Sequence, residues 1–193
     1  MLIKQIDILV HPDYYQMSVP NLPLHERQLV LREKWEQRID LLKERQDTIL
    51  LHFSYMATRL LKQGLQDLST ISNRVERDEI ERIKRSMAKL GNRFIWFGWF
   101  VIPDSDLFEE LFKSRDLIYI PDKTKIRGYG EIFKMCMGSS VYDTALSLDI
   151  PSSNVKCYRK ESLTNSDCTE INKWRVNQLS NQYNNSFMAQ EGG

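Results

Sequence analysis

Short apolar strands alternate with amphipathic helices along most of the chain, and this alternation predicts an α/β protein. Strands are expected at residues 6–10, 48–53, 94–102, 117–120, 126–131 and 155–159, and helices at 24–45, 55–62, 73–90 and 107–114. Helical crossovers let neighbouring strands run parallel. The strand at 94–102 is apolar throughout, as expected where helices cover both faces. We therefore predict a Rossmann-like three-layer sandwich, with a mainly parallel sheet of five or six strands and helices on both faces.

The first strand and the first helix have clear boundaries in the sequence. The apolar run from Ile6 to Val10 ends at His11, because the following Pro12 lacks the N–H that a central strand needs. The helix at 24–45 has apolar residues at spacings of three and four, which predict one buried stripe: Leu31, Trp35, Ile39 and Leu42.

The helix at 73–90 carries a capping-box pattern, with Asn73 as the N-cap and Glu76 at the third helical position. Gly91 and Asn92 end it. Its apolar residues are expected to face inward, and they are Val75, Ile80, Ile83, Met87 and Leu90.

The second half of the chain begins with a helix at 107–114, which Asp106 can cap. The strands at 117–120 and 126–131 are joined by about five residues, so they form either a hairpin or one kinked strand. A hairpin would make the sheet mixed at this point. Residues 125–159 read as strand, turn, helix, loop and strand, with Cys136 near the start of the helix.

The domain organisation follows from these elements. Residues 1–164 are predicted to form a single α/β domain with a helical insertion at about 55–91. The C-terminal part, 165–193, is predicted to hold a helix at 168–179 and then a polar tail. Low hydrophobicity from Ser180 onward predicts disorder there.

Composition narrows the classes of partner. Among the 193 residues, 41% are hydrophobic and 27% are charged, with a formal net charge of +1. This balance gives no basic footprint for nucleic acid. No apolar run reaches the roughly 18 residues of a membrane span. Three cysteines without CxxC spacing favour free thiols in the cytoplasm. Three scattered histidines predict no metal site, and the absence of GxGxxG and GxxxxGK[ST] predicts no cofactor.

Ligands of open α/β sheets bind at the carboxyl ends of the strands, so the residues that follow the strands are the candidate binding residues. They include His11, Asp13, Tyr14, Asp104 and Glu131. Asp13 is suited to act as a general base and His11 to titrate near neutrality. The alternative is structural: Asp13 forms a turn after Pro12, and His11 completes the strand end.

Cys136 is the candidate nucleophile. A thiol at a helix N-terminus feels the positive end of the macrodipole, which lowers its pKa, and Lys134 would add to the effect. The alternative is a small buried apolar residue, because free cysteine is among the most buried residue types and this helix is largely apolar.

The run from Gly130 to Met137 (GEIFKMCM) resembles the strand-to-helix nucleophile turn of isochorismatase-like cysteine hydrolases, the group that includes nicotinamidases. The resemblance covers only this strand, turn and helix. It implies that Cys136 is the nucleophile and that Asp13 is its base. The lysine of that family has no clear counterpart here, and the threonine expected in the turn is absent.

Two functions are therefore expected from the sequence. The first is a cytoplasmic protein with a small-molecule site at the carboxyl edge, in its sharpest form a hydrolase that uses Cys136 and Asp13. The second is a non-catalytic binding or interaction protein that uses the charged helices 24–45 and 73–90 and forms a homo-oligomer.

Overall fold

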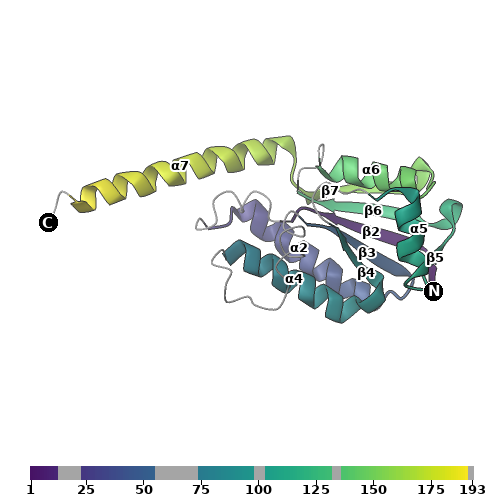
Figure 1. Cartoon of the computed structure of the whole chain (residues 1–193). Coiled ribbons are helices and arrows are strands. Elements are labelled where there is room, and N and C mark those ends of the chain that lie inside the picture. The colour runs from purple at the N-terminus through teal and green to yellow at the C-terminus, as the bar shows by residue number, and fades with distance from the viewer. Residues whose placement is uncertain (13–22, 55–73, 98–102, 132–135, 191–193) are drawn as a thin grey trace.

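A computed structural model describes residues 1–12, 23–54, 74–97, 103–131 and 136–190. Its centre is a five-stranded sheet in the order β4-β3-β2-β6-β7 (Figure 1). The strands are β2 (Gln5–Val10), β3 (Thr48–Phe53), β4 (Phe94–Phe97), β6 (Lys125–Gly130) and β7 (Val155–Ser162). Every pair of neighbouring strands is parallel. The predicted Rossmann-like sandwich is thus confirmed.

Helices cover both faces of this sheet. Helices α2 (Glu26–Lys43) and α4 (Arg74–Leu90) supply the side chains of one apolar core, together with Leu9 and Leu50 from the strands. Helices α5 (Ser105–Lys113) and α6 (Gly138–Ser147) supply those of the other core. Single 3₁₀ turns lie at η2 (Gly91–Arg93), η3 (Pro121–Lys123) and η5 (Ser152–Asn154).

The segment around residues 117–120 differs from one of its two predicted forms. Strand β5 (Ile118–Tyr119) pairs in parallel with β1 (Leu2–Ile3) in a separate two-stranded sheet. The hairpin is therefore wrong, because β5 and β6 both run beside the N-terminal segment in the same direction. The alternative of one kinked strand is closer, with η3 forming the kink.

Helix α2 begins at a capping box that the sequence analysis did not identify. The His25 imidazole accepts a hydrogen bond from the backbone N–H of Arg27, and the Gln28 side chain accepts one from the backbone N–H of His25. The predicted stripe is confirmed, because Leu31, Trp35, Ile39 and Leu42 are all buried.

Helix α4 corrects the predicted inward face. Ile80, Ile83 and Leu90 are buried as expected, but Met87 is 43% exposed. Its inward face carries polar side chains instead: Glu79, Arg82 and Ser86. The error arose because an apolar pattern assigns polar residues to solvent, whereas Glu79 and Arg82 find partners on β3 and α2. The predicted cap at Asn73 and the helix at 55–62 lie outside the described residues.

Helix α5 starts earlier than predicted, and its cap is Asp104. The Asp104 carboxylate accepts a hydrogen bond from the Leu107 backbone N–H at 2.9 Å. Asp106, the predicted cap, lies instead in the first turn, where a negative charge complements the helix dipole.

Helix α7 (Asn165–Gln190) is longer than the predicted C-terminal helix. It extends away from the body of the molecule (Figure 1). From Ser180, where the sequence predicts disorder, α7 continues to Gln190 through a segment without proline or glycine. None of the helices in the described ranges is long and apolar enough to cross a membrane.

Candidate ligand site at the carboxyl edge of the sheet

The direction in which the strands are added to the sheet reverses at β2. The chain proceeds from β2 to β3 and β4 on one side, then returns to place β6 and β7 on the other. In open α/β sheets the crevice at such a reversal is the usual ligand site. Here the reversal lies where β2 ends at Val10 and β6 ends at Gly130, which are paired in register.

His11 follows β2 directly and has an unusual backbone. Its φ of 45° lies in the left-handed region, which costs a residue other than glycine roughly 1–3 kcal/mol. Its N–H donates to the Phe53 carbonyl at 2.7 Å, and the side chain is 4% exposed. Burial lowers the pKa of His11 to about 4, His52 acts in the same direction, and Glu79 opposes both. The expected titration near neutrality is thus corrected: His11 is neutral there.

Gly130 brings β6 close to β2 at the same point. Its φ of 139° favours glycine, and a Cβ placed there would lie 2.2 Å from the Val10 carbonyl oxygen. The following residue, Glu131, donates its backbone N–H to that same carbonyl at 3.1 Å. The Glu131 side chain is 1% exposed, so a carboxyl group is buried at the reversal.

Cys136 lies two residues before α6 and contacts both apolar cores. A side chain can touch the cores on opposite faces of a sheet only at its edge, which places Cys136 at the carboxyl edge. The thiol is half-buried. Burial raises its pKa, the nearby Glu131 acts in the same direction, and a backbone hydrogen bond opposes both. The predicted lowering of the Cys136 pKa is therefore wrong, because burial outweighs the helix terminus.

A buried polar cluster lies beside His11, beneath α4. The fully buried carboxylate of Glu79 bonds His52 Nε2 at 2.9 Å and Arg82 Nη1 at 2.7 Å, and it accepts a hydrogen bond from the Ser54 side chain. Burial alone would raise the pKa of Glu79, but His52, Arg82 and Ser54 together lower it to about 2. Glu79 is thus ionised, so it accepts the His52 Nε2–H.

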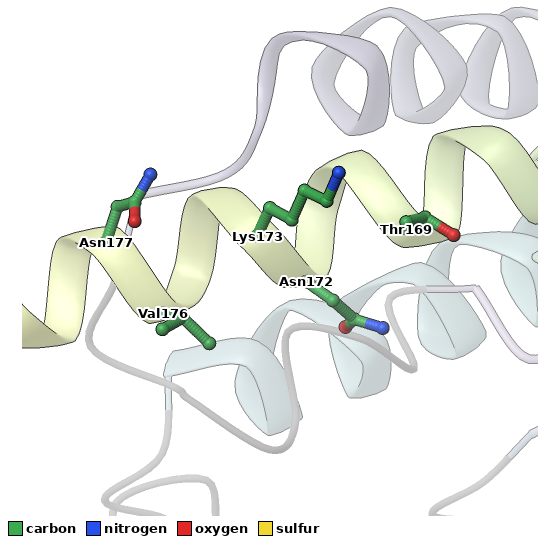
Figure 2. A pocket seen from close by; sticks show the side chains of 5 residues that line it. All are labelled: Thr169, Asn172, Lys173, Val176 and Asn177. Atoms are coloured by element: carbon green, nitrogen blue, oxygen red, sulfur yellow. The ribbon is translucent and has the colours of Figure 1, made fainter.

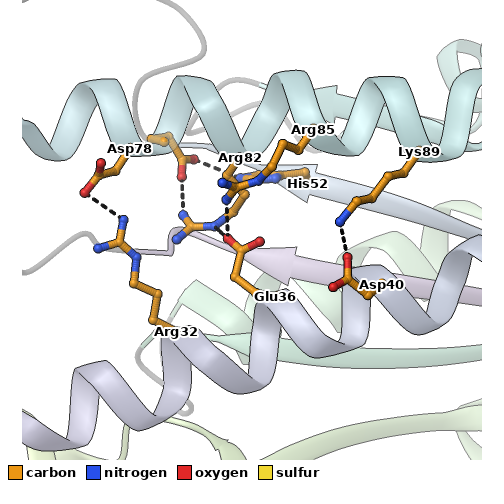
Figure 3. Close-up of polar contacts among 9 residues, drawn as sticks. Arg32, Glu36, Asp40, His52, Asp78, Arg82, Arg85 and Lys89 are labelled. Carbon is orange, nitrogen blue, oxygen red and sulfur yellow. Dashed lines mark hydrogen bonds and ion pairs between the residues drawn. The ribbon is translucent and has the colours of Figure 1, made fainter.

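The Arg82 guanidinium continues this cluster into the space between α2 and α4. Its Nε donates to Glu36 at 2.9 Å, and Arg85 contacts the same carboxylate at 3.0 Å (Figure 3). Further ion pairs join the two helices on either side: Arg32 with Asp78, and Lys89 with Asp40. The charged faces predicted to serve a partner are therefore used in large part to hold α2 and α4 together.

A second polar cluster is centred on Asp7, in the middle of β2. Asp7 is fully buried, and Arg38 lies 3.5 Å from it. Burial raises the pKa of Asp7, while Arg38 is the largest opposing influence. The same guanidinium pairs with Glu161 at 2.5 Å and stacks over the Tyr129 ring at 4.6 Å. Arg38 of α2 thus contacts side chains of β2, β6 and β7, so we interpret this cluster as one that holds α2 against the sheet.

Sequence reasoning missed the residues of both clusters. A signal was present, because Asp7 and His52 interrupt otherwise apolar strands (QIDILV and TILLHF). A polar residue at a buried strand position needs a partner and thus marks a polar network. The partners themselves come from helices distant in sequence, so the composition of each cluster could not be read locally.

Three of the predicted site residues follow strands that are neighbours in the sheet. His11 and Glu131 follow the paired residues Val10 and Gly130, and Glu131 acts electrostatically on the Cys136 thiol. Asp104 is exposed and caps α5. Asp13 and Tyr14 lie outside the described residues. Within the described ranges, no group of three or more His, Cys, Asp and Glu side chains is arranged to hold a metal ion.

The fold defines a class: an α/β protein with a Rossmann-like parallel sheet whose strand order reverses at β2, with polar residues at the strand ends there. Comparison with known proteins does not narrow this class, since no protein family, curated protein or solved structure matches the chain.

Proposed function

We propose that the chain binds a small molecule at the carboxyl ends of β2 and β6. One observation carries this proposal: the strand order reverses at β2, and the strands on either side of the reversal are followed by a strained His11, a buried Glu131 and a half-buried Cys136. Backbone strain tends to persist at ligand sites, where surrounding contacts hold it in place. A neutral imidazole can donate one hydrogen bond and accept one, so polar uncharged groups such as amides suit a site beside His11.

In its sharper form, the proposal makes the protein a hydrolase with Cys136 as nucleophile. The thiol would lose its proton to a base as sulfur attacks the carbonyl carbon. The leaving group would depart with a proton, and water would then cleave the thioester and restore the thiol. The resemblance to cysteine hydrolases suggests Asp13 as the base. Glu131 is a second candidate for the base, because its carboxyl group is near enough to raise the pKa of the Cys136 thiol.

Binding can be tested by amide NMR of the full chain, titrated with nicotinamide and other small carboxamides. We expect saturable shifts at His11, Gly130 and Glu131. The variant His11→Asn, whose side chain tolerates left-handed backbone, should weaken binding, whereas His25→Asn at the α2 cap should not. Shifts confined to other surfaces, or no shift across the panel, would contradict the proposal.

The hydrolase form can be tested separately with p-nitrophenyl acetate. We expect a burst of p-nitrophenol and an acetyl adduct on Cys136 in the wild type. Cys136→Ser should remove both the burst and the adduct. Cys157→Ser is the matched control, because Cys157 is also a half-buried thiol whose pKa is raised by burial, and this variant should keep both. Equal bursts from all three proteins would refute a nucleophilic Cys136 and leave the binding proposal standing.

A further inference from the structure

Among the side chains of helix α7 that the structure describes, the buried ones lie in its first turns. They are Cys168, Ile171 and Arg175. Beyond Arg175, none of the side chains that the structure describes is buried, and Val176 is 62% exposed. The rest of the helix extends away from the sheet (Figure 1).

The projecting part of α7 has an apolar stripe in its sequence. Val176, Leu179, Tyr183 and Phe187 recur at spacings of three and four, which on a helix share one face. With 3.6 residues per turn, this face is rotated by about 90° from the face that holds Cys168, Ile171 and Arg175. The stripe is therefore not a continuation of the contact between α7 and the body.

A groove runs along α7 where the stripe begins. It is lined by Thr169, Asn172, Lys173, Val176 and Asn177. Asn172 and Val176 project to one side of the helix, whereas Lys173 and Asn177 project to the other (Figure 2). The stripe thus starts at Val176, on the side of the helix away from Lys173, the charged residue among the described lining residues.

Charge indicates what kind of partner fits this segment. Residues 176–190 contain no Asp, Glu, Lys, Arg or His. A charged partner would find no opposite charge there, whereas a second copy of the segment would meet no like-charge repulsion. The segment is also rich in Asn and Ser, which are weak helix formers, so its helix needs packing to be stable in water.

We propose that residues 176–190 of α7 pair with the same segment of a second copy of this chain. An antiparallel arrangement about a two-fold axis opposes the two helix dipoles and places the two bodies at opposite ends. Such a contact is closed, since each copy uses the same surface, so the product is a dimer. The apolar stripe forms the contact between the two helices, and the Val176 of each copy lies at the end of the contact nearest its own body.

The test is the mass of the full chain in solution, measured by light scattering from micromolar to near-millimolar concentration. The wild type should dimerise. Val176→Lys should weaken the dimer roughly 100-fold, because the substitution removes apolar burial twice in a symmetric pair. Asn177→Lys adds the same charge one residue away, on the other side of the helix, and should dimerise like the wild type.

Two additional measurements separate this proposal from its alternatives. Tyr183→Lys should weaken the dimer as Val176→Lys does, and far-UV circular dichroism should show both variants folded. The dissociation constant should not change between low and high salt, because the segment carries no charge. A wild type that stays monomeric would overturn the proposal. So would equal effects of Val176→Lys and Asn177→Lys, or a dimer that salt dissociates.

Discussion

The pKa of His11 makes the stability of this protein depend on pH in a defined window. A histidine has a pKa near 6.5 in an unfolded chain, whereas burial and His52 lower that of His11 to about 4. The unfolded state therefore binds the proton more readily. The contribution of a neutral His11 to stability is complete above about pH 6.5 and is lost as pH falls towards 4. Integrated over this window, the loss is about 3 kcal/mol.

The variant His11→Asn isolates this effect. Asparagine tolerates the left-handed backbone at φ 45°, so the strand end keeps its conformation. Urea unfolding at pH 7 and at pH 4 should show the wild type losing about 3 kcal/mol more than His11→Asn between the two. Subtracting the loss in His11→Asn from the loss in the wild type cancels the contributions of the titrating groups that both proteins share, including Asp7.

His25→Asn is the matched control, because it replaces a histidine outside the cluster with another good N-cap residue. It should lose stability with falling pH as the wild type does. If His11→Asn and the wild type show the same dependence between pH 7 and pH 4, then His11 is not held neutral by its surroundings and the reasoning fails.

Two further substitutions test packing and charge. Glu79→Gln removes the carboxylate that holds Arg82 in the interior and should lower the free energy of unfolding by about 3–5 kcal/mol. The control is Glu81→Gln, on the same helix but in a half-exposed pair with Lys84 at 3.9 Å, and it should change the free energy of unfolding by less than about 0.5 kcal/mol. Equal losses for the two variants in urea unfolding would contradict a buried network. Gly128→Ala would place a Cβ 2.2 Å from the Val141 side chain and should cost roughly 1–3 kcal/mol. Adding Val141→Ala should relieve part of that cost, and strictly additive effects in the double-mutant cycle would argue against this close approach.

Local patterns in the sequence were enough to predict most of the fold. The strand TILLHF was predicted with the bounds that the structure has, because it is apolar and bounded by polar residues. The stripe on α2 was equally clear, since all four of its apolar residues face the sheet. The strand is buried at every position and the helix along one stripe, so in both cases the local pattern of apolar residues is enough to predict how the element is buried.

The errors come from contacts between segments that are distant in sequence. Met87 was placed inward because the partners of Glu79 and Arg82 belong to β3 and α2 and cannot be seen in the pattern of α4. The hairpin after β5 was an open alternative because the true partner, β1, lies at the other end of the chain.

The strand ends that hold the candidate residues could be predicted from sequence, but their electrostatics could not. The rule that ligands bind at carboxyl ends selected His11, Glu131 and Cys136, and all three follow strands of the central sheet. Their pKa values depend on burial and on nearby groups, which only the folded chain brings together. For His11 and Cys136, burial proved the largest influence, and it reversed the local expectation for the thiol.

The position of β2 in the sheet has a consequence for the order of folding. This strand precedes the other four strands of its sheet in the sequence, yet it is central: β3 pairs on one side and β6 on the other. During synthesis, β2, β3 and β4 with α2 and α4 form a contiguous half that can associate before β6 emerges. Until then the second edge of β2 is open. The apolar side chains Ile6, Ile8 and Val10, which later meet α5 and α6, are exposed for the same interval, so this edge is where a nascent chain most needs protection from aggregation.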